Sequence, residues 1–169
     1  MGKRAFIVTQ SIKKLRKEDK ELAQNGKDFR RLSDHRKIDL NNLEGDETDQ
    51  LYYKGIPYTS GNPDQRPIIT YSPKYAAYQK SIRDAQVERA KTMIQDGSTK
   101  KNRKKPNDLA RFIDKPAATK NGEAADIHYY LDEEKILEES EYDGLYAVCT
   151  DLLDDEVGEI LKVSEGRCR

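Results

Sequence analysis

The side chains of this chain that are best placed to do chemistry are cations that could bind phosphate. A stretch after residue 97 holds five of them within six positions: Lys100, Lys101, Arg103, Lys104 and Lys105. A Lys or Arg that neutralises a phosphate releases a condensed counterion, so this loop is a candidate contact for the DNA backbone. The competing interpretation is a solvated loop without a ligand.

Further candidates for phosphate contact lie on predicted helices: Arg83, Arg89, Lys13 and Lys14. The first two are on a long helix that leads into the basic loop, so helix and loop together could form one phosphate-binding element. The other two belong to a Lys-rich stretch near the start of the chain, for which a solvated helix face is the competing interpretation.

Two acidic groups, at residues 132–134 and 154–156, have the composition of metal ligands. Each precedes a segment with helical spacing of apolar residues, where negative charge is favourable because of the helix dipole. We therefore interpret both groups as helix starts. The two histidines, His35 and His128, are far apart and have no Cys-x-x-Cys partner, so no structural zinc site is predicted. The chain also lacks the motifs of a glycine-rich phosphate loop and of a nucleophilic hydrolase.

Charge is balanced over the whole chain but unevenly distributed. The 31 basic and 31 acidic residues give a net charge of zero. Residues 1–37 and 72–122 carry net charges of +7 and +8, whereas residues 38–71 and 123–169 carry −4 and −11. Such blocks permit a positive face for a polyanion beside an acidic face. Self-complementary surface charge in a soluble protein is the alternative.

The composition limits the size of the core and the location of the protein. Of 169 residues, 35% are hydrophobic and 37% are charged, which suits one domain, or one domain with an insertion, around a modest core. Neither a run of about 18 apolar residues nor a signal peptide is recognisable, so we expect a cytoplasmic protein without membrane contact. Cys149 and Cys168 are expected to be reduced packing residues rather than a disulfide.

Two strands near the ends of the chain are expected to position the other elements. Residues 145–149 form a near-continuous apolar run after an Asp-Gly turn pair, as in a central strand buried on both faces. Residues 5–9 are apolar and β-branched enough to form a second buried strand, and we expect the two to be neighbours in one sheet. The acidic residues 154–156 then begin an amphipathic helix that is still running at Arg169.

The charged middle of the chain is predicted to be a mixed α+β segment. Its longest element is a helix over about residues 73–96, because Ser72-Pro73 is a good helix start and Gly97 ends the apolar spacing. The other expected elements are short: one or two helices in residues 12–37, an antiparallel strand pair at 51–58 and 66–72, strands at 111–113 and 127–131, and a helix to residue 140 that Asp132 caps.

Both ends of the chain resemble a known family. The run DEEKILEESEYDGLYAVCTDLLDDEVGEILKVSEGR is similar to the segment that leads into the catalytic Glu of insertion-sequence transposases of the DDE type, the group with a Tyr, Arg, Glu, Lys signature. Arg167 fits the signature Arg, Ser164 stands at the Tyr position, and the Glu would fall two positions beyond Arg169. The strand AFIVTQS resembles the family's segment just after the second catalytic Asp, which would lie upstream of Met1.

The resemblance implies a place in a DNA-transposing enzyme. Such transposases bind two Mg²⁺ ions through three carboxylates on an RNase H-like core, and the ions activate the attacking oxygen and stabilise the leaving oxygen. This chain would be a truncated piece lying between two of those carboxylates, with no catalytic or metal-binding residue of its own. The resemblance gives Arg167 a role near the DNA or in steadying the catalytic helix. It implies as partners duplex DNA at the transposon ends and the remaining transposase segments, and it is compatible with a homo-oligomer.

Residues and resemblance together predict an α/β chain with a partial RNase H-like core. Residues 1–12 would supply one core strand, and residues 141–169 the other core strand and the start of the catalytic helix. Residues 13–140 would be an insertion with the long helix and the basic loop 98–106. The expected function is DNA binding within a transposase that is inactive as this piece alone. The alternatives are a non-enzymatic α/β module that binds nucleic acid or an acidic protein, and a purely structural domain.

Overall fold

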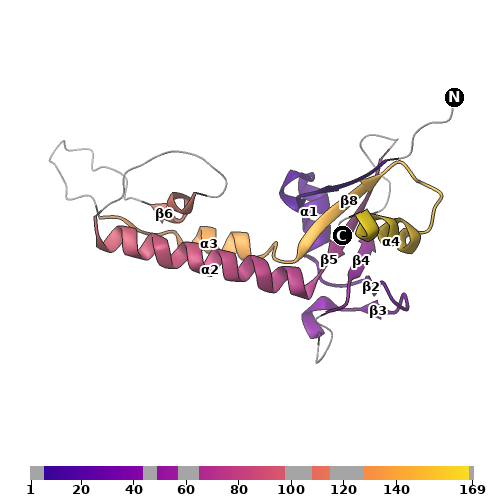
Figure 1. Cartoon of the computed structure of the whole chain (residues 1–169), viewed down its shortest axis with the longest axis horizontal. Helices are drawn as coiled ribbons and strands as arrows, with labels where there is room; N and C mark the ends of the chain where they lie inside the picture. Colours follow the sequence, from indigo (N-terminus) through magenta and orange to yellow (C-terminus); the bar gives the residue numbers. More distant parts are fainter. Residues whose placement is uncertain (1–5, 44–48, 57–64, 98–107, 115–127, 168–169) are drawn as a thin grey trace. The chain divides into compact units, whose positions relative to one another are not determined.

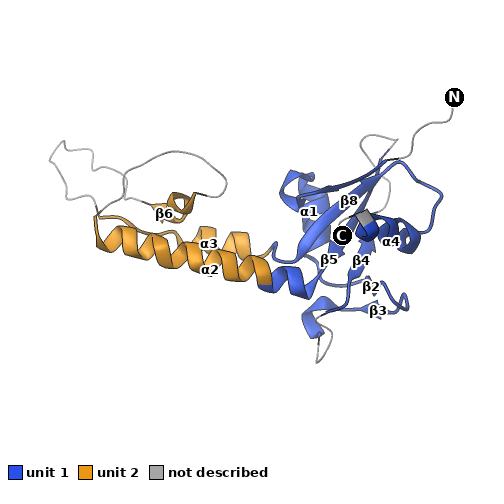
Figure 2. Ribbon diagram, in the orientation of Figure 1, with its two compact units in different colours: residues 1–77, 142–169 blue, residues 78–141 orange. Residues whose placement is uncertain are grey.

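The structure, a computed structural model, describes residues 6–43, 49–56, 65–97, 108–114 and 128–167. It divides into two compact units, which Figure 2 shows in blue and orange. Unit 1 comprises residues 1–77 and 142–169, and unit 2 comprises residues 78–141. Each unit is described by itself below.

Among the described residues, unit 1 contains a six-stranded sheet in which each neighbouring pair is antiparallel. From one edge to the other, its strands are β1 (Ile7–Gln10), β8 (Leu145–Thr150), β5 (Arg66–Tyr71), β4 (Tyr52–Gly55), β2 (Phe29–Arg31) and β3 (Lys37–Ile38). The helices of this unit include α1 (Lys17–Gln24) and α4 (Val157–Arg167) (Figure 1). The predicted mixture of helices and strands is confirmed.

The predicted buried strand near the end of the chain is β8. It pairs with β1 on one side and with β5 on the other, and Ala147 and Val148 are 0% and 1% exposed. Burial of a side chain of the size of Val148 contributes about 1.5–3 kcal/mol to folding. Because Val8 lies opposite Cys149, the prediction that the two end strands are neighbours in one sheet is also confirmed.

The prediction that the first strand is buried was wrong. β1 is the edge strand of the sheet, Thr9 is exposed, and the side chain of Val8 is 52% exposed. An apolar, β-branched run indicates a strand, but its burial depends on what lies beside and above it. Among the described residues, β1 has a neighbouring strand on one side alone.

Apolar side chains alternate between the two faces of the sheet. Along β5, Ile69 belongs to the cluster that contains Ile12 together with Ala23 of α1, and the partly buried Leu22 of α1 packs on the same cluster. Ile68 belongs to the opposite cluster, which contains Ile160 and Leu161 of α4. The period of two along a strand therefore places α1 against one face and α4 against the other.

The middle of the chain contributes to the same sheet. The predicted antiparallel pair at residues 51–58 and 66–72 is confirmed as β4 and β5, and β5 continues the sheet onto β8. Because Ile68, Ile69 and Thr70 are 0% exposed, β5 requires cover on both faces and cannot stand apart as part of a small separate pair. The predicted insertion, residues 13–140, is therefore divided between the two units.

Two helix starts follow the predicted capping chemistry. The long helix is α2 (Pro73–Gln95), where the Tyr75 backbone N–H donates to Ser72 Oγ at 3.2 Å and Gly97 follows with a φ of 64°. The helix α3 (Glu133–Ser140) is capped by Asp132, whose carboxylate accepts from the Lys135 backbone N–H at 2.9 Å. The second acidic group differs from expectation, because α4 begins at Val157 and residues 154–156 lie in the loop before it.

Unit 2 is organised around the guanidinium of Arg111. This residue lies in the 3₁₀ helix η4 (Leu109–Phe112), which leads into β6 (Ile113–Asp114), and β6 pairs with β7 (Tyr130–Leu131). Arg111 donates to Glu139 Oε1 at 3.0 Å and to Gln86 Oε1 at 2.6 Å, and it lies 4.0 Å from the centre of the Phe112 ring. One cation thereby joins α2, η4 and α3.

Two further expectations concern membranes and cysteines. In the part of the chain that the structure describes, no helix has the length and apolar character needed to span a bilayer. Cys149 is a free thiol buried in β8, and this burial raises its pKa above the usual value for a cysteine. Cys168 lies outside the described residues.

The turn before β8 requires a glycine, so Gly144→Ala should destabilise the protein by about 2–4 kcal/mol. Gly144 has a φ of 78°, and an added Cβ would lie 2.8 Å from both the Ser72 carbonyl oxygen and the Ala76 Cβ. Urea unfolding followed by circular dichroism measures the loss. Gly97→Ala is the matched control, because its φ is also positive but its Cβ would meet nothing within 4 Å. An equal loss for the two variants would show that the close contact at Gly144 does not matter.

The Arg111 network leads to a second stability prediction. Arg111→Gln should destabilise unit 2 by about 2 kcal/mol, because it removes hydrogen bonds to a charged group whose side chain is only 19% exposed. Lys91→Gln, which breaks an exposed pair with Glu88, should cost about 0.5 kcal/mol or less. Amide hydrogen exchange of α3 measures both effects, and equal exchange rates in the two variants would contradict the role of Arg111.

Candidate nucleic-acid interface

Strands β2 and β3 form a hairpin that is rich in cations. It carries Arg30, Arg31, Arg36 and Lys37, of which Arg30, Arg36 and Lys37 are exposed. Arg30 lies opposite Lys37 on β3 and opposite Tyr53 on β4. The sequence analysis missed this hairpin, because dense charge in residues 12–37 was interpreted as short helices.

Hydrogen bonds within the hairpin fix its turn. The His35 N–H donates to the Arg31 carbonyl at 2.9 Å, and the Arg31 N–H donates to the Arg36 carbonyl at 3.0 Å. Arg31 also forms a two-point ion pair with Asp34, at 3.0 and 2.5 Å. This guanidinium, together with the Arg36 backbone N–H, lowers the pKa of Asp34 to about 2. His35 itself has a φ of 58°, which is uncommon for a residue other than glycine.

The hairpin is anchored to the neighbouring strand and helix through His35. Its Nδ1 lies 2.8 Å from the Tyr53 hydroxyl, and the two rings meet edge to face. On the other side, a Cβ on Gly158 would lie 2.8 Å from His35 Cε1, so the glycine lets the imidazole approach the first turn of α4. Burial raises the pKa of Tyr53, which keeps its hydroxyl protonated.

Two cations next to the hairpin have structural partners. Arg66 Nη1 donates to the carbonyls of Leu153 and Asp155, at 3.1 and 3.0 Å, and thereby holds the loop before α4. Lys54 Nζ donates to three backbone carbonyls at the end of α1 and just after it, and partial burial lowers its pKa. Both side chains satisfy carbonyl oxygens that secondary structure leaves unpaired.

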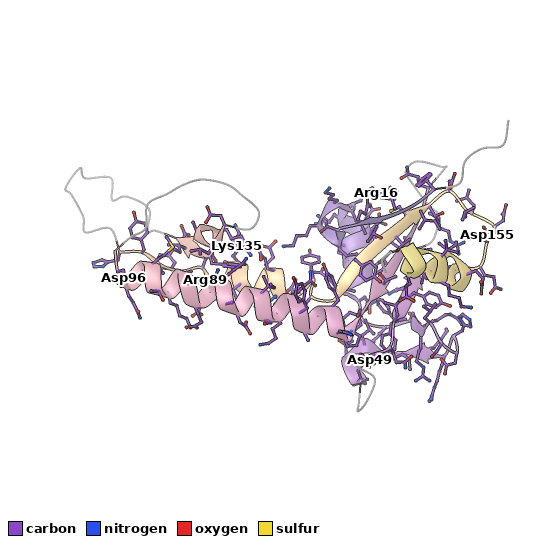
Figure 3. All side chains as sticks on the ribbon, in the orientation of Figure 1. Arg16, Asp49, Arg89, Asp96, Lys135 and Asp155 are labelled. Atoms are coloured by element: carbon purple, nitrogen blue, oxygen red, sulfur yellow. The ribbon has the colours of Figure 1, made fainter. Side chains whose placement is uncertain are left out.

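A hollow of about 920 Å³ lies between the hairpin and the start of α4. Its lining includes Arg30, His35 and Lys37 of the hairpin, and also the carboxylates of Asp28 and of residues 154–156. Asp155 is labelled in Figure 3, on the loop between β8 and α4. Among the described residues, no group of three or more His, Cys, Asp or Glu side chains is arranged to hold a metal ion. On the hairpin side, the lining residues Arg30 and Lys37 supply charged donors that suit phosphate oxygens.

The residues predicted from sequence to contact DNA are divided between the two units. Lys13 and Lys14 are exposed on the 3₁₀ helix η1 (Ile12–Lys14) of unit 1, with Lys13 Nζ 5.9 Å from the centre of the Tyr142 ring. Arg83 and Arg89 lie on α2 in unit 2; Arg89 is exposed and labelled in Figure 3. Arg83 is only 8% exposed, which leaves little of it for a ligand.

For the other residues that were predicted to contact DNA, the structure describes no side-chain positions. Lys100, Lys101, Arg103, Lys104 and Lys105 lie outside the described residues. Arg167 is the last residue of α4, and its side chain is also outside the description. The structure therefore adds the hairpin of unit 1 as a basic surface.

The Arg31–Asp34 pair gives a prediction for pH dependence. Arg31→Gln should raise the pKa of Asp34 from about 2 towards the ordinary Asp value of about 3.9, because the guanidinium is the main cause of the shift. Since folding depresses this pKa, the pair stabilises the hairpin above the ordinary pKa and is lost as the pH falls through about 2. Carbon-13 NMR of the Asp34 carboxyl measures the titration. Arg36→Gln is the control, because its backbone N–H remains and the shift should be smaller; an unchanged pKa in Arg31→Gln would contradict the assignment.

Comparisons with known proteins found no relative of this chain. No protein-family model matches the chain, and no significant match was found among curated proteins or among solved structures. The function that the chain supports best must therefore be argued from its own residues and contacts.

Proposed function

We infer that the chain is the part of an insertion-sequence DDE transposase that lies between the second catalytic Asp and the catalytic Glu. The observation that carries this proposal is the pairing of β1 with β8, because these strands contain the two stretches that resemble the family. Their pairing is continued by side chains beyond the ladder. The Phe6 N–H donates to Asp151 Oδ1 at 2.8 Å, and the Thr150 hydroxyl donates to the Phe6 carbonyl at 2.7 Å.

This pairing meets a requirement of two-metal catalysis. Three carboxylates must converge on the same pair of metal ions, so a segment that joins two of them must bring its own ends together. Here β1 and β8 are adjacent, and α4 follows β8 and packs Ile160 and Leu161 on the same sheet. The two strands lie side by side even though most of the chain separates them in the sequence.

The proposed contribution of this chain is DNA contact rather than chemistry. The described residues contain no cluster that fits Mg²⁺, so no metal-dependent step is assigned to them. In the proposed full-length transposase, the metal ligands would be the three carboxylates outside this chain. Exposed cations such as Lys14 and Arg89 would then contact the phosphates of the transposon ends.

A non-enzymatic nucleic-acid-binding module is the second candidate. Exposed cations in both units, among them Lys14 and Arg89, are also what such a module presents. It differs from the first candidate in requiring no catalytic carboxylates on either side of the chain. The two candidates are therefore separated by what precedes and follows the chain in its gene.

The proposal predicts the coding sequence on both sides of the chain. Genomic DNA upstream should encode an Asp shortly before Met1, and DNA downstream should encode a Glu two codons after Arg169. A protein extended to include all three carboxylates of the proposed active site should cut transposon-end DNA when Mg²⁺ is added, whereas the present chain should not. If neither carboxylate is encoded, the transposase assignment fails and the binding module remains.

A further inference from the structure

We propose that the exposed cations of the β2–β3 hairpin, Arg30, Arg36 and Lys37, form a contact surface for the phosphate backbone of duplex DNA. These three residues are called the hairpin cations below. The inference rests on the proposed function in that DNA is taken as the partner, but it assigns the contact to a surface that sequence analysis did not identify.

The hairpin cations have no ion-pair partner among the described residues. The hairpin's one carboxylate, Asp34, is paired with Arg31. Arg30 donates to a neutral acceptor, the His35 carbonyl, at 3.2 Å. Elsewhere on the surface, Lys17, Lys80 and Lys162 each have a carboxylate partner three or four residues away on the same helix. The hairpin therefore carries three positive charges without the local carboxylate partners that Lys17, Lys80 and Lys162 have.

Two of the hairpin cations face each other across the hairpin. Arg30 and Lys37 lie directly opposite each other on neighbouring strands, an arrangement in which like charges are destabilising. A lysine on an edge strand is often explained as protection against aggregation, and Lys37 on β3 fits that explanation. Arg30 does not, because β2 lies between β3 and β4. An anionic partner would relieve the repulsion between the two cations.

The backbone that carries the hairpin cations is held in place by contacts within the hairpin and to its neighbours. The Arg31–Asp34 pair closes the turn, and His35 joins it to Tyr53 and to the first turn of α4 at Gly158. A preorganised surface loses less conformational freedom when it binds than a mobile loop does. The hairpin is therefore suited to keep its cations aligned with the regularly spaced phosphates of a DNA backbone.

The absence of apolar surface favours a phosphate backbone over an acidic protein. Protein interfaces contain a buried apolar core, whereas non-specific DNA contact depends on cations and hydrogen-bond donors. Within residues 29–38, no large hydrophobic side chain is exposed. The carboxylates of Asp28 and of residues 154–156 line the hollow and would repel a polyanion from its interior. Contact would accordingly fall on the exposed ends of the hairpin cations.

The test is fluorescence anisotropy of the full chain with a labelled DNA duplex across a salt series. The main variant replaces all three hairpin cations: Arg30→Gln, Arg36→Gln and Lys37→Gln. Because Arg30 also bonds within the hairpin, a double variant, Arg36→Gln with Lys37→Gln, keeps that bond intact. The matched control removes the same charge from cations that already have partners: Lys17→Gln, Lys80→Gln and Lys162→Gln.

We expect the DNA affinity of the hairpin variants, and not that of the control, to depend less steeply on salt concentration than the affinity of the wild-type chain. The slope of log affinity against log salt concentration should fall by about 0.9 for each phosphate contact removed, so by about 2–3 in the triple variant and about 2 in the double variant. Affinity near 0.1 M salt should fall at least about tenfold in both, with the control close to wild type.

Four results would overturn the inference. They are wild-type affinity in both hairpin variants, an equal loss in the control, no binding of wild-type chain to the duplex, and displacement of the duplex by polyglutamate at the same charge concentration as by unlabelled DNA. The last result would indicate an acidic protein as the partner. None of these results changes whether catalytic carboxylates are encoded on either side of the chain, so failure of this inference and failure of the transposase proposal are distinguishable.

Discussion

The structure of unit 1 depends on one interior strand, β8. Both edges of this strand need hydrogen-bonding partners, and both of its faces need apolar cover. β8 is a largely apolar strand, and water cannot satisfy its backbone groups once Ala147 and Val148 are buried. Its ladder groups are taken up by β1 and β5, and its side chains are covered by the clusters that include residues of α1 and α4. Segments from the start, the middle and the end of the sequence are thereby drawn into one sheet. In a chain with so little apolar content, this is the main source of long-range order.

Besides the cations that pair with nearby carboxylates, two further kinds of cation differ in what their charged ends contact. Lys54 and Arg66 donate to backbone carbonyls, and Arg111 joins three elements of unit 2. These side chains are part of the architecture, although their sequence context looks no different from that of a solvated surface. The hairpin cations, in contrast, are held by the backbone but have no carboxylate of their own among the described residues. This difference, rather than the number of Lys and Arg residues, separates structural cations from candidate ligand contacts.

The parts of the fold that sequence predicted are those with a local cause. The Ser72-Pro73 start of α2, the Asp132 cap of α3 and the apolar run of β8 each depend on neighbouring residues, and each is found. The hairpin was missed because its strands have three and two residues and its turn uses a left-handed His35, for which no Gly or Asn gives a signal. The exposure of β1 was missed because burial depends on neighbours that are distant in sequence. Of the candidate site, only the chemistry of the cations was predictable; which of them are structural depends on carbonyl groups brought close by the fold.

The central claim is that β1 and β8 are adjacent antiparallel strands, since both the sheet and the proposed place in a transposase depend on it. Nuclear Overhauser contacts between backbone protons of residues 7–10 and 147–150 test it most directly. The account predicts cross-strand contacts that pair Val8 with Cys149 and Thr9 with Val148. Contacts from residues 7–10 to a different strand, or none to residues 147–150 in the folded protein, would contradict it.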